Sequence, residues 1–385
     1  MLSTIKNNRS LTFYQQQRTT TNSMITASHG GGIASALIAD TSFYTGTATS
    51  GYNTQLQTFL TNLNAKRAAD ITNLDLTKAN ITARNRGVQR AWEYECADVE
   101  MGGNGSGNWD KAQRSEIKHT GKVRGAEGHH QRNVADHPEQ QADPDNIKFY
   151  KDRQKHLKEG HNGDWHNESD AELIDKNKML EKTNSNRVFR NELKGLGIAV
   201  AIGLGIGVTI GFVTTLAQSG ITPDSLKYAA AESVKAGAES GILSAVGYGI
   251  GRTIGETAAK ALTGMIENFG IQITENISTM VNMGTIGTLT IAVFSVYQFI
   301  KLKRRGYATR EAVLQIGKQA LFSLSLLTVS IAAQGIWGGA AGIIVSVSIG
   351  VIMISYSVKN TVHQRRFSEK IRVYTIENCY PQFAV

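Results

Sequence analysis

Residues 127–161 read EGHHQRNVADHPEQQADPDNIKFYKDRQKHLKEGH, and this stretch decides the fold of the region around it. Apolar and polar residues alternate over 146–150, which predicts a half-buried strand. Asp152 is a candidate N-cap of a helix, and Gly160 is a candidate C-terminal stop. The predicted order is therefore strand, polar loop, short strand and helix.

Histidines are concentrated in the same region, because seven of the nine lie within residues 119–166. His129 and His130 are adjacent, His156 falls inside the predicted helix, and His161 comes just after it. Phosphodiester hydrolysis needs a base that takes a proton from water and a cation that neutralises charge on the phosphate. One of two adjacent histidines can bind that cation while its neighbour acts as the base. A helix packed on the strands can bring a further imidazole to the same ion.

In order and spacing, these motifs resemble the HNH endonuclease superfamily, in the Gly-His-His branch related to endonuclease VII. The resemblance covers about residues 87–168 and includes Gly128-His129-His130, the Asp-Pro-Asp-Asn-Ile run at 143–147, and His156-Leu157. It implies a small ββα-metal fold. The Cys-x-x-Cys zinc pairs of many relatives are missing, because the chain has only two cysteines.

The resemblance also implies roles for individual residues. His130 would be the general base, and His129 and His156 metal ligands. Asn146 would be the central asparagine, which in the endonuclease VII branch is itself a ligand. His161 stands five positions after His156, where four is usual, which leaves its role as a third ligand open. The implied cofactor is a divalent metal ion, Mg²⁺ or Zn²⁺, and the implied substrate is DNA or RNA.

The remainder of the chain has a different composition. The formal net charge of +9 divides into +3 over 1–80, zero over 81–194 and +6 over 195–385. The basic excess therefore does not mark the histidine region as a nucleic-acid binder. Uncharged runs at 195–220, 276–300 and 319–358 are long enough to cross a bilayer, which argues against a wholly soluble enzyme.

The distribution of basic residues predicts an orientation. Loop 301–318 has six basic residues and one acid, and the tail after 358 is also basic, so both are expected in the cytoplasm. Four crossings, at about 195–217, 277–300, 319–335 and 339–358, satisfy this expectation. They place the histidine region on the cytoplasmic side of the membrane, the inner membrane if the cell is bacterial. Whether 238–265 also crosses is left open.

Small residues recur every four positions at Ala199, Gly203, Gly207 and Gly211. Such faces let helices approach closely in lipid and could mediate homo-oligomers. They also support an alternative function: a non-enzymatic glycine-zipper pore or scaffold, with a degenerate metal-binding histidine domain.

The sequence thus predicts an α+β protein, with a small nuclease domain preceded by helices and followed by an all-α, glycine-rich membrane domain. We expect a membrane-anchored, metal-dependent endonuclease that acts in antiphage defence, in a mobile element or as a toxin. Its partners would be DNA, membrane lipid and an immunity or regulatory protein. The expected parts are a flexible polar arm (1–50), a helical segment (51–100), the nuclease domain (101–170), a charged helical linker (171–194), the membrane domain (195–358) and a basic tail (359–385).

Overall fold

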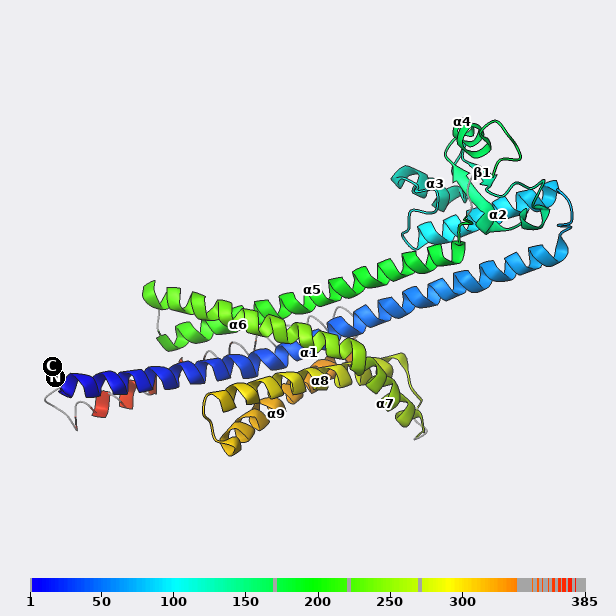
Figure 1. The fold of residues 1–385 in the computed structure, drawn as a ribbon. Helices are drawn as coiled ribbons and strands as arrows, with labels where there is room; N and C mark the ends of the chain where they lie inside the picture. The colour runs from blue at the N-terminus through cyan, green and yellow to red at the C-terminus, as the bar shows by residue number, and fades with distance from the viewer. Residues whose placement is uncertain are drawn as a thin grey trace. The chain divides into compact units, whose positions relative to one another are not determined.

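The computed structural model describes residues 2–168, 172–219, 223–268 and 272–337, with scattered positions between 348 and 378. The chain divides into two compact units (Figure 1). Thr47–Glu192 is called the histidine unit below, and Met1–Gly46 with Leu193–Val385 is called the apolar unit. The division falls inside two long helices, α1 (Leu2–Asn73) and α5 (Lys176–Ser219).

The histidine unit combines helices with one two-stranded sheet. Its strands pair antiparallel with His130 opposite Ile147, and two short 3₁₀ turns lie in the connection between them. The order of strand, loop, strand and helix is as predicted, although Asn146 ends a 3₁₀ turn instead of opening the second strand. Besides α1 and α5, the elements are α2 (Ile81–Glu100), α3 (Lys111–Thr120), β1 (Glu127–His130), η1 (Pro138–Gln140), η2 (Pro144–Asn146), β2 (Ile147–Tyr150), α4 (Arg153–Lys155) and η3 (His156–His161).

Local sequence explains where these helices begin. Asn80 caps α2 by accepting a hydrogen bond from the backbone N–H of Thr82. Asp110 caps α3 in a reciprocal capping box with Gln113. Asp152 caps α4, as the sequence predicts, through a 2.7 Å bond from the Lys155 N–H.

An aromatic core fixes the sheet against α2. The Trp92 ring lies 4.1 Å from Phe149 and 5.5 Å from Trp109, measured between centroids. Ile147 and Phe149 of β2 belong to the same cluster, which also contains Ala91 of α2. Because β2 alternates its side chains, this packing fixes its register and thereby the register of β1.

A buried carboxylate joins α2 to the start of α5. Glu95 accepts hydrogen bonds from the Ser106 N–H, the Ser106 hydroxyl and the Trp109 indole N–H, and pairs with Lys176 at 3.1 Å. Gly105 has a φ of +67°, and a Cβ atom there would clash with the Glu95 carboxylate. The glycine run therefore allows the loop to wrap around Glu95.

We expect Lys176→Met to lower the free energy of unfolding of the histidine unit by about 3–5 kcal/mol, because it leaves the Glu95 charge buried and unpaired. Lys178→Met is the control, since Lys178 is 80% exposed beside Asp175 and such pairs contribute about 0–1 kcal/mol. Urea denaturation followed by tryptophan fluorescence measures both. Similar midpoints for the two variants would contradict this account of Glu95.

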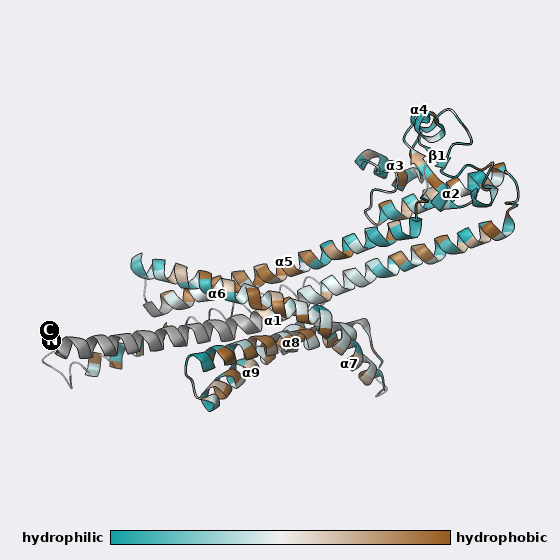
Figure 2. Cartoon of the chain, viewed as in Figure 1, coloured by the Kyte–Doolittle hydropathy of each residue, from teal (hydrophilic) through white to brown (hydrophobic). Residues whose placement is uncertain are grey.

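The elements described in the apolar unit are all helices, joined by short connections such as 305–308. Three helical segments are long and apolar enough to cross a membrane: Lys176–Val213, Ile277–Arg304 and Thr309–Ala332. They include most of the predicted crossings at 195–217, 277–300 and 319–335, whereas most of 339–358 lies outside the described residues. Figure 2 shows the apolar residues along α8 and α9. With parts of α1 and α5, the helices are α6 (Pro223–Ile250), η4 (Gly251–Gly255), α7 (Glu256–Asn268), α8 (Glu275–Arg304) and α9 (Thr309–Trp337).

The flexible arm predicted over 1–50 differs from the structure, which places 2–73 in one helix. No proline occurs before Pro138, so no residue of this stretch is barred from a helix interior. Ala34 and Ile38 are fully buried and pack in a cluster with Ala199 and Phe294 of the apolar unit. Tertiary packing therefore compensates for the weak helix propensity of the Thr- and Asn-rich sequence.

The small residues of α5 pack against α6. A Cβ atom on Gly207 would lie 2.5 Å from the Ala236 carbonyl oxygen, and one on Gly211 would lie 3.0 Å from the Ala236 Cβ. Gly203 faces Ser244 of the same helix. This face is used for packing within the chain, so it does not support the predicted homo-oligomer contact.

Gly207→Val should destabilise the apolar unit by about 1–3 kcal/mol more than Gly205→Val, because only Gly207 faces a neighbouring backbone. Gly205 lies on the same helix with nothing within 4 Å of its would-be Cβ, so the two variants share the same change in helix propensity. Thermal unfolding of the full chain in detergent, followed by far-UV circular dichroism, makes the comparison. Equal losses would mean that close packing of α5 on α6 contributes little.

Candidate metal centre

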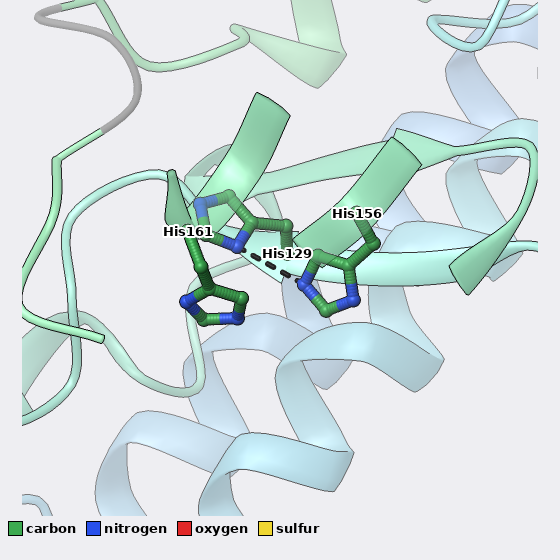
Figure 3. A group of neighbouring side chains, drawn as sticks. All are labelled: His129, His156 and His161. Carbon is green, nitrogen blue, oxygen red and sulfur yellow. Dashed lines mark hydrogen bonds between the residues drawn. The ribbon is translucent and has the colours of Figure 1, made fainter. Parts of the chain in front are cut away.

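His129, His156 and His161 lie together, although they come from β1 and η3 (Figure 3). Nδ1 of His129 lies 3.1 Å from Nε2 of His156, and the ring centroids of His129 and His161 are 4.8 Å apart. One ligand atom from each ring lies within 4.8 Å of the others. Within the described ranges, this is the one group of three or more His, Cys, Asp or Glu side chains placed to share a metal ion.

The helix type explains how two histidines five positions apart share a site. On an α-helix, neighbours on one face are three or four residues apart. Helix η3 is a π-helix, with hydrogen bonds from residue i to i+5, so residues five apart come close together. The ring centroids of His156 and His161 are accordingly 4.8 Å apart.

Gly160 allows η3 to approach β1. A Cβ atom at this position would lie 3.1 Å from Nδ1 of His129 and 3.1 Å from the Tyr150 ring. The sequence predicts that the helix stops at Gly160, and the structure differs from this prediction. The helix continues through His161 and ends at Asn162, whose φ of 48° is left-handed. The glycine serves close packing, and Asn162 terminates the helix.

Glu127 orients His156 and was missed by the sequence reasoning. Its carboxylate accepts a 2.6 Å hydrogen bond from Nδ1 of His156, so the other ring nitrogen faces His129. A carboxylate behind a histidine is the usual support of a metal-ligating imidazole. The sequence does contain a signal for this role. Glu127 stands two residues before His129, and strand side chains two positions apart share a face.

The environment of His129 favours a neutral ring. The side chain is 3% exposed, and burial together with the neighbouring His156 and His161 lowers its pKa to about 3. Burial, followed by the charge of His156, also lowers the pKa of His161. In the described part of the chain, Nε2 of His129 and Nδ1 of His161 are buried without a hydrogen-bond partner.

His130 follows His129 on β1 and is hydrogen-bonded to the connection between the strands. Its Nε2 lies 2.9 Å from the backbone oxygen of Gln141. A carbonyl oxygen only accepts hydrogen bonds, so Nε2 carries the proton and Nδ1 has the free lone pair. Burial lowers the pKa of His130 to about 4, which keeps the ring neutral at neutral pH.

Gln141 holds this carbonyl in place and was also missed, because a backbone acceptor leaves no signature in sequence. Its buried side chain accepts from the Asn80 N–H at 2.7 Å and donates to the Lys78 oxygen at 2.9 Å. A Cβ atom on Gly87 of α2 would lie 2.5 Å from the Gln141 oxygen. The start of α2 therefore fixes the acceptor of His130.

Asn146 is buried, and its side-chain amide is hydrogen-bonded to the backbone that follows His130. Its Oδ1 accepts from the Arg132 N–H at 2.8 Å, and its Nδ2 donates to the Arg132 oxygen at 3.0 Å. Its backbone oxygen accepts from the Gln131 N–H at 2.9 Å. The side chain thus clamps the residues that follow β1, and its oxygen is engaged by backbone instead of facing the trio.

The comparisons with known proteins place part of this unit in a family. Residues 78–151 match the family model Tox-GHH, described as a GHH signature containing HNH/Endo VII superfamily nuclease toxin. Neither the curated proteins nor the solved structures include a match to the chain.

The matched segment is about a fifth of the chain and contains His129, His130 and Asn146, while His156 and His161 lie beyond its end at residue 151. It includes α2, α3, both strands and their connection. Residues 78–151 therefore match the GHH-signature nuclease toxin domains of the HNH/Endo VII superfamily.

Proposed function

We propose that the chain is a metal-dependent nuclease that hydrolyses phosphodiester bonds in nucleic acid. The observation that carries the proposal is the convergence of His129, His156 and His161 beside His130, on a segment that matches a nuclease toxin family. A decayed domain in a pore or scaffold would have no reason to keep this set together. The intact site therefore disfavours the non-enzymatic alternative.

The three imidazoles fit a divalent metal ion. Nδ1 of His129 and Nε2 of His156 face each other at 3.1 Å, and one ligand atom from each of the three rings lies within 4.8 Å of the others. Burial lowers the pKa of His129 and of His161, which favours the neutral rings that a metal ion needs. Three protein ligands leave coordination positions open, as in catalytic zinc sites. Imidazole suits zinc and other transition ions better than magnesium, so we favour Zn²⁺ over Mg²⁺.

When bound, the ion would neutralise charge that develops on the phosphate and on the leaving oxygen. The chain itself supplies the base: Nδ1 of neutral His130 accepts a proton from the attacking water. Gln141 holds the ring in the required tautomer through its carbonyl oxygen. Asn146 keeps the chain after His130 in position through Arg132.

The substrate must bring its phosphate between His130 and the trio. Arg84, in the first turn of α2, contributes a positive charge near both sides, since it lowers the pKa of His130 and of His161. Its side chain is exposed and could contact phosphate. Such a contact carries no base sequence information, so we propose weak sequence preference on DNA or RNA.

To test the function, the full chain is incubated with plasmid DNA and with RNA, in the presence of Zn²⁺, Mn²⁺ or Mg²⁺ and with chelator. We expect cleavage that chelator abolishes. His130→Ala should lose cleavage by at least about 100-fold and keep metal affinity, because it removes a general base. His129→Ala should lose both cleavage and metal affinity.

His119→Ala is the matched control, because His119 is exposed on α3 and its Nδ1 lies 2.6 Å from the Ser115 backbone oxygen of the same helix. It should cleave like the parent chain. Equal loss of metal affinity in His129→Ala and His130→Ala would contradict the division of roles. Cleavage that survives chelator would contradict metal dependence.

We also propose that the apolar unit associates with a membrane and that the histidine unit faces the cytoplasm. The support is the three apolar helices and the basic residues around the α8–α9 connection. Among the settings considered, the family description favours a toxin over antiphage defence or a mobile element.

Cysteine labelling in intact cells tests the orientation after Cys96 and Cys379 are replaced by serine. Cysteine at Ala308, between α8 and α9, should be protected from an impermeant reagent. Cysteine at Asp224, at the start of α6, should react. Both positions are exposed in the structure. The reverse pattern would place the histidine unit outside.

A further inference from the structure

The connection between β1 and β2, residues 131–146, carries the two groups that position His130. They are the Gln141 carbonyl and the Asn146 amide. Residues outside the Tox-GHH segment 78–151 anchor this connection, and the family match does not include them.

Arg67 of α1 supplies the strongest of these anchors. Its guanidinium bridges two carboxylates, with Nη2 2.9 Å from Asp143 and Nη1 3.0 Å from Asp145. The three side chains are only 22%, 23% and 15% exposed. A planar guanidinium that bonds two carboxylates at once fixes their direction as well as their distance, unlike a single exposed ion pair.

The approach to α5 holds the same turn from another side. The Ile174 N–H donates to the Asp145 backbone oxygen at 2.8 Å, and the Lys176 N–H donates to the Asp145 carboxylate at 3.0 Å. Asp145 is thus bonded to Arg67 and to the chain that opens α5, both outside the family segment.

These contacts lead directly to Asn146. Asp143 accepts from the Asp145 N–H at 2.9 Å and, through its backbone oxygen, from the Asn146 N–H at 3.1 Å. Asn146 then bonds Gln131 and Arg132, the two residues that follow His130. A chain of hydrogen bonds therefore runs from Arg67 to the neighbours of His130.

We propose that Arg67 is a positioning residue of the nuclease, which acts through Asp143, Asp145 and Asn146 on the placement of His130. The inference rests on the proposed function and extends the working site beyond the family segment to α1. Its consequence is that a chain cut to 78–151 would lack the anchor of its own active-site connection.

The test compares Arg67→Gln with Lys66→Gln in the full chain. Lys66 is adjacent on α1 and forms a half-exposed pair with Glu93, so the control removes a neighbouring charge without touching the connection. We expect Arg67→Gln to lower kcat about 10–100-fold, as loss of a supporting partner does, with KM and metal affinity within about twofold of the parent. Arg67→Lys should recover kcat only in part. It keeps the positive charge, but an ammonium cannot bridge both carboxylates with fixed geometry.

Two further readouts separate positioning from a general loss of structure. When Arg67→Gln is added to Asn146→Ala, kcat should fall by a further factor of less than about two, because the path through Asn146 is already broken. Hydrogen exchange should show faster exchange over 131–146 in Arg67→Gln, while α3 keeps the protection of the parent. Lys66→Gln should leave both segments unchanged.

Unchanged kcat and unchanged exchange in Arg67→Gln would overturn the inference. So would a full additional loss in the Asn146→Ala background, or loss of protection throughout the unit. Hydrogen exchange needs no cleavage. A parent chain that fails to cleave would therefore reject the proposed function, and the exchange result would still show whether Arg67 holds the connection.

Discussion

The structure of the histidine unit depends on one close approach, that of η3 to β1. His129 is buried at the end of a strand, and its ring can meet His156 and His161 only if the helix backbone comes almost into contact with it. Gly160 permits that approach, since a Cβ there would already press on the His129 ring. The π-helical turn then brings His156 and His161 to the same point. The aromatic core and the Glu95–Lys176 pair hold the strands and helices that this contact requires.

Much of the site was predictable because it is local in sequence. The paired histidines, the strand at 146–150 and the Asp152 cap are read from adjacent residues, and the structure has the cap and a strand one residue shorter, at Ile147–Tyr150. The spacing of His161 was an obstacle only under the assumption of an α-helix, since a five-residue interval fits a π-helix. The Tox-GHH match confirms the family resemblance over the part of the site up to β2.

What the sequence did not provide is non-local or carried by backbone. Arg67 lies far along the chain from Asp143 and Asp145, and nothing in its surroundings marks it as different from Lys66. The acceptor of His130 is a carbonyl oxygen, which every residue possesses. The helix over 2–73 was missed because its polar composition resembles an arm, while burial of Ala34 and Ile38 depends on partners distant in sequence. These contacts depend on tertiary packing between residues distant in sequence, which local patterns do not predict.

The central claim is that three imidazoles of this chain hold one divalent metal ion. Zinc K-edge X-ray absorption of the full chain, loaded with one equivalent of Zn²⁺, tests it most directly, with His119→Ala and His161→Ala measured alongside. The account predicts about three imidazole nitrogens at about 2.0–2.1 Å in the parent and in His119→Ala, and one fewer in His161→Ala. A shell without imidazole, or the same shell in all three proteins, would contradict it.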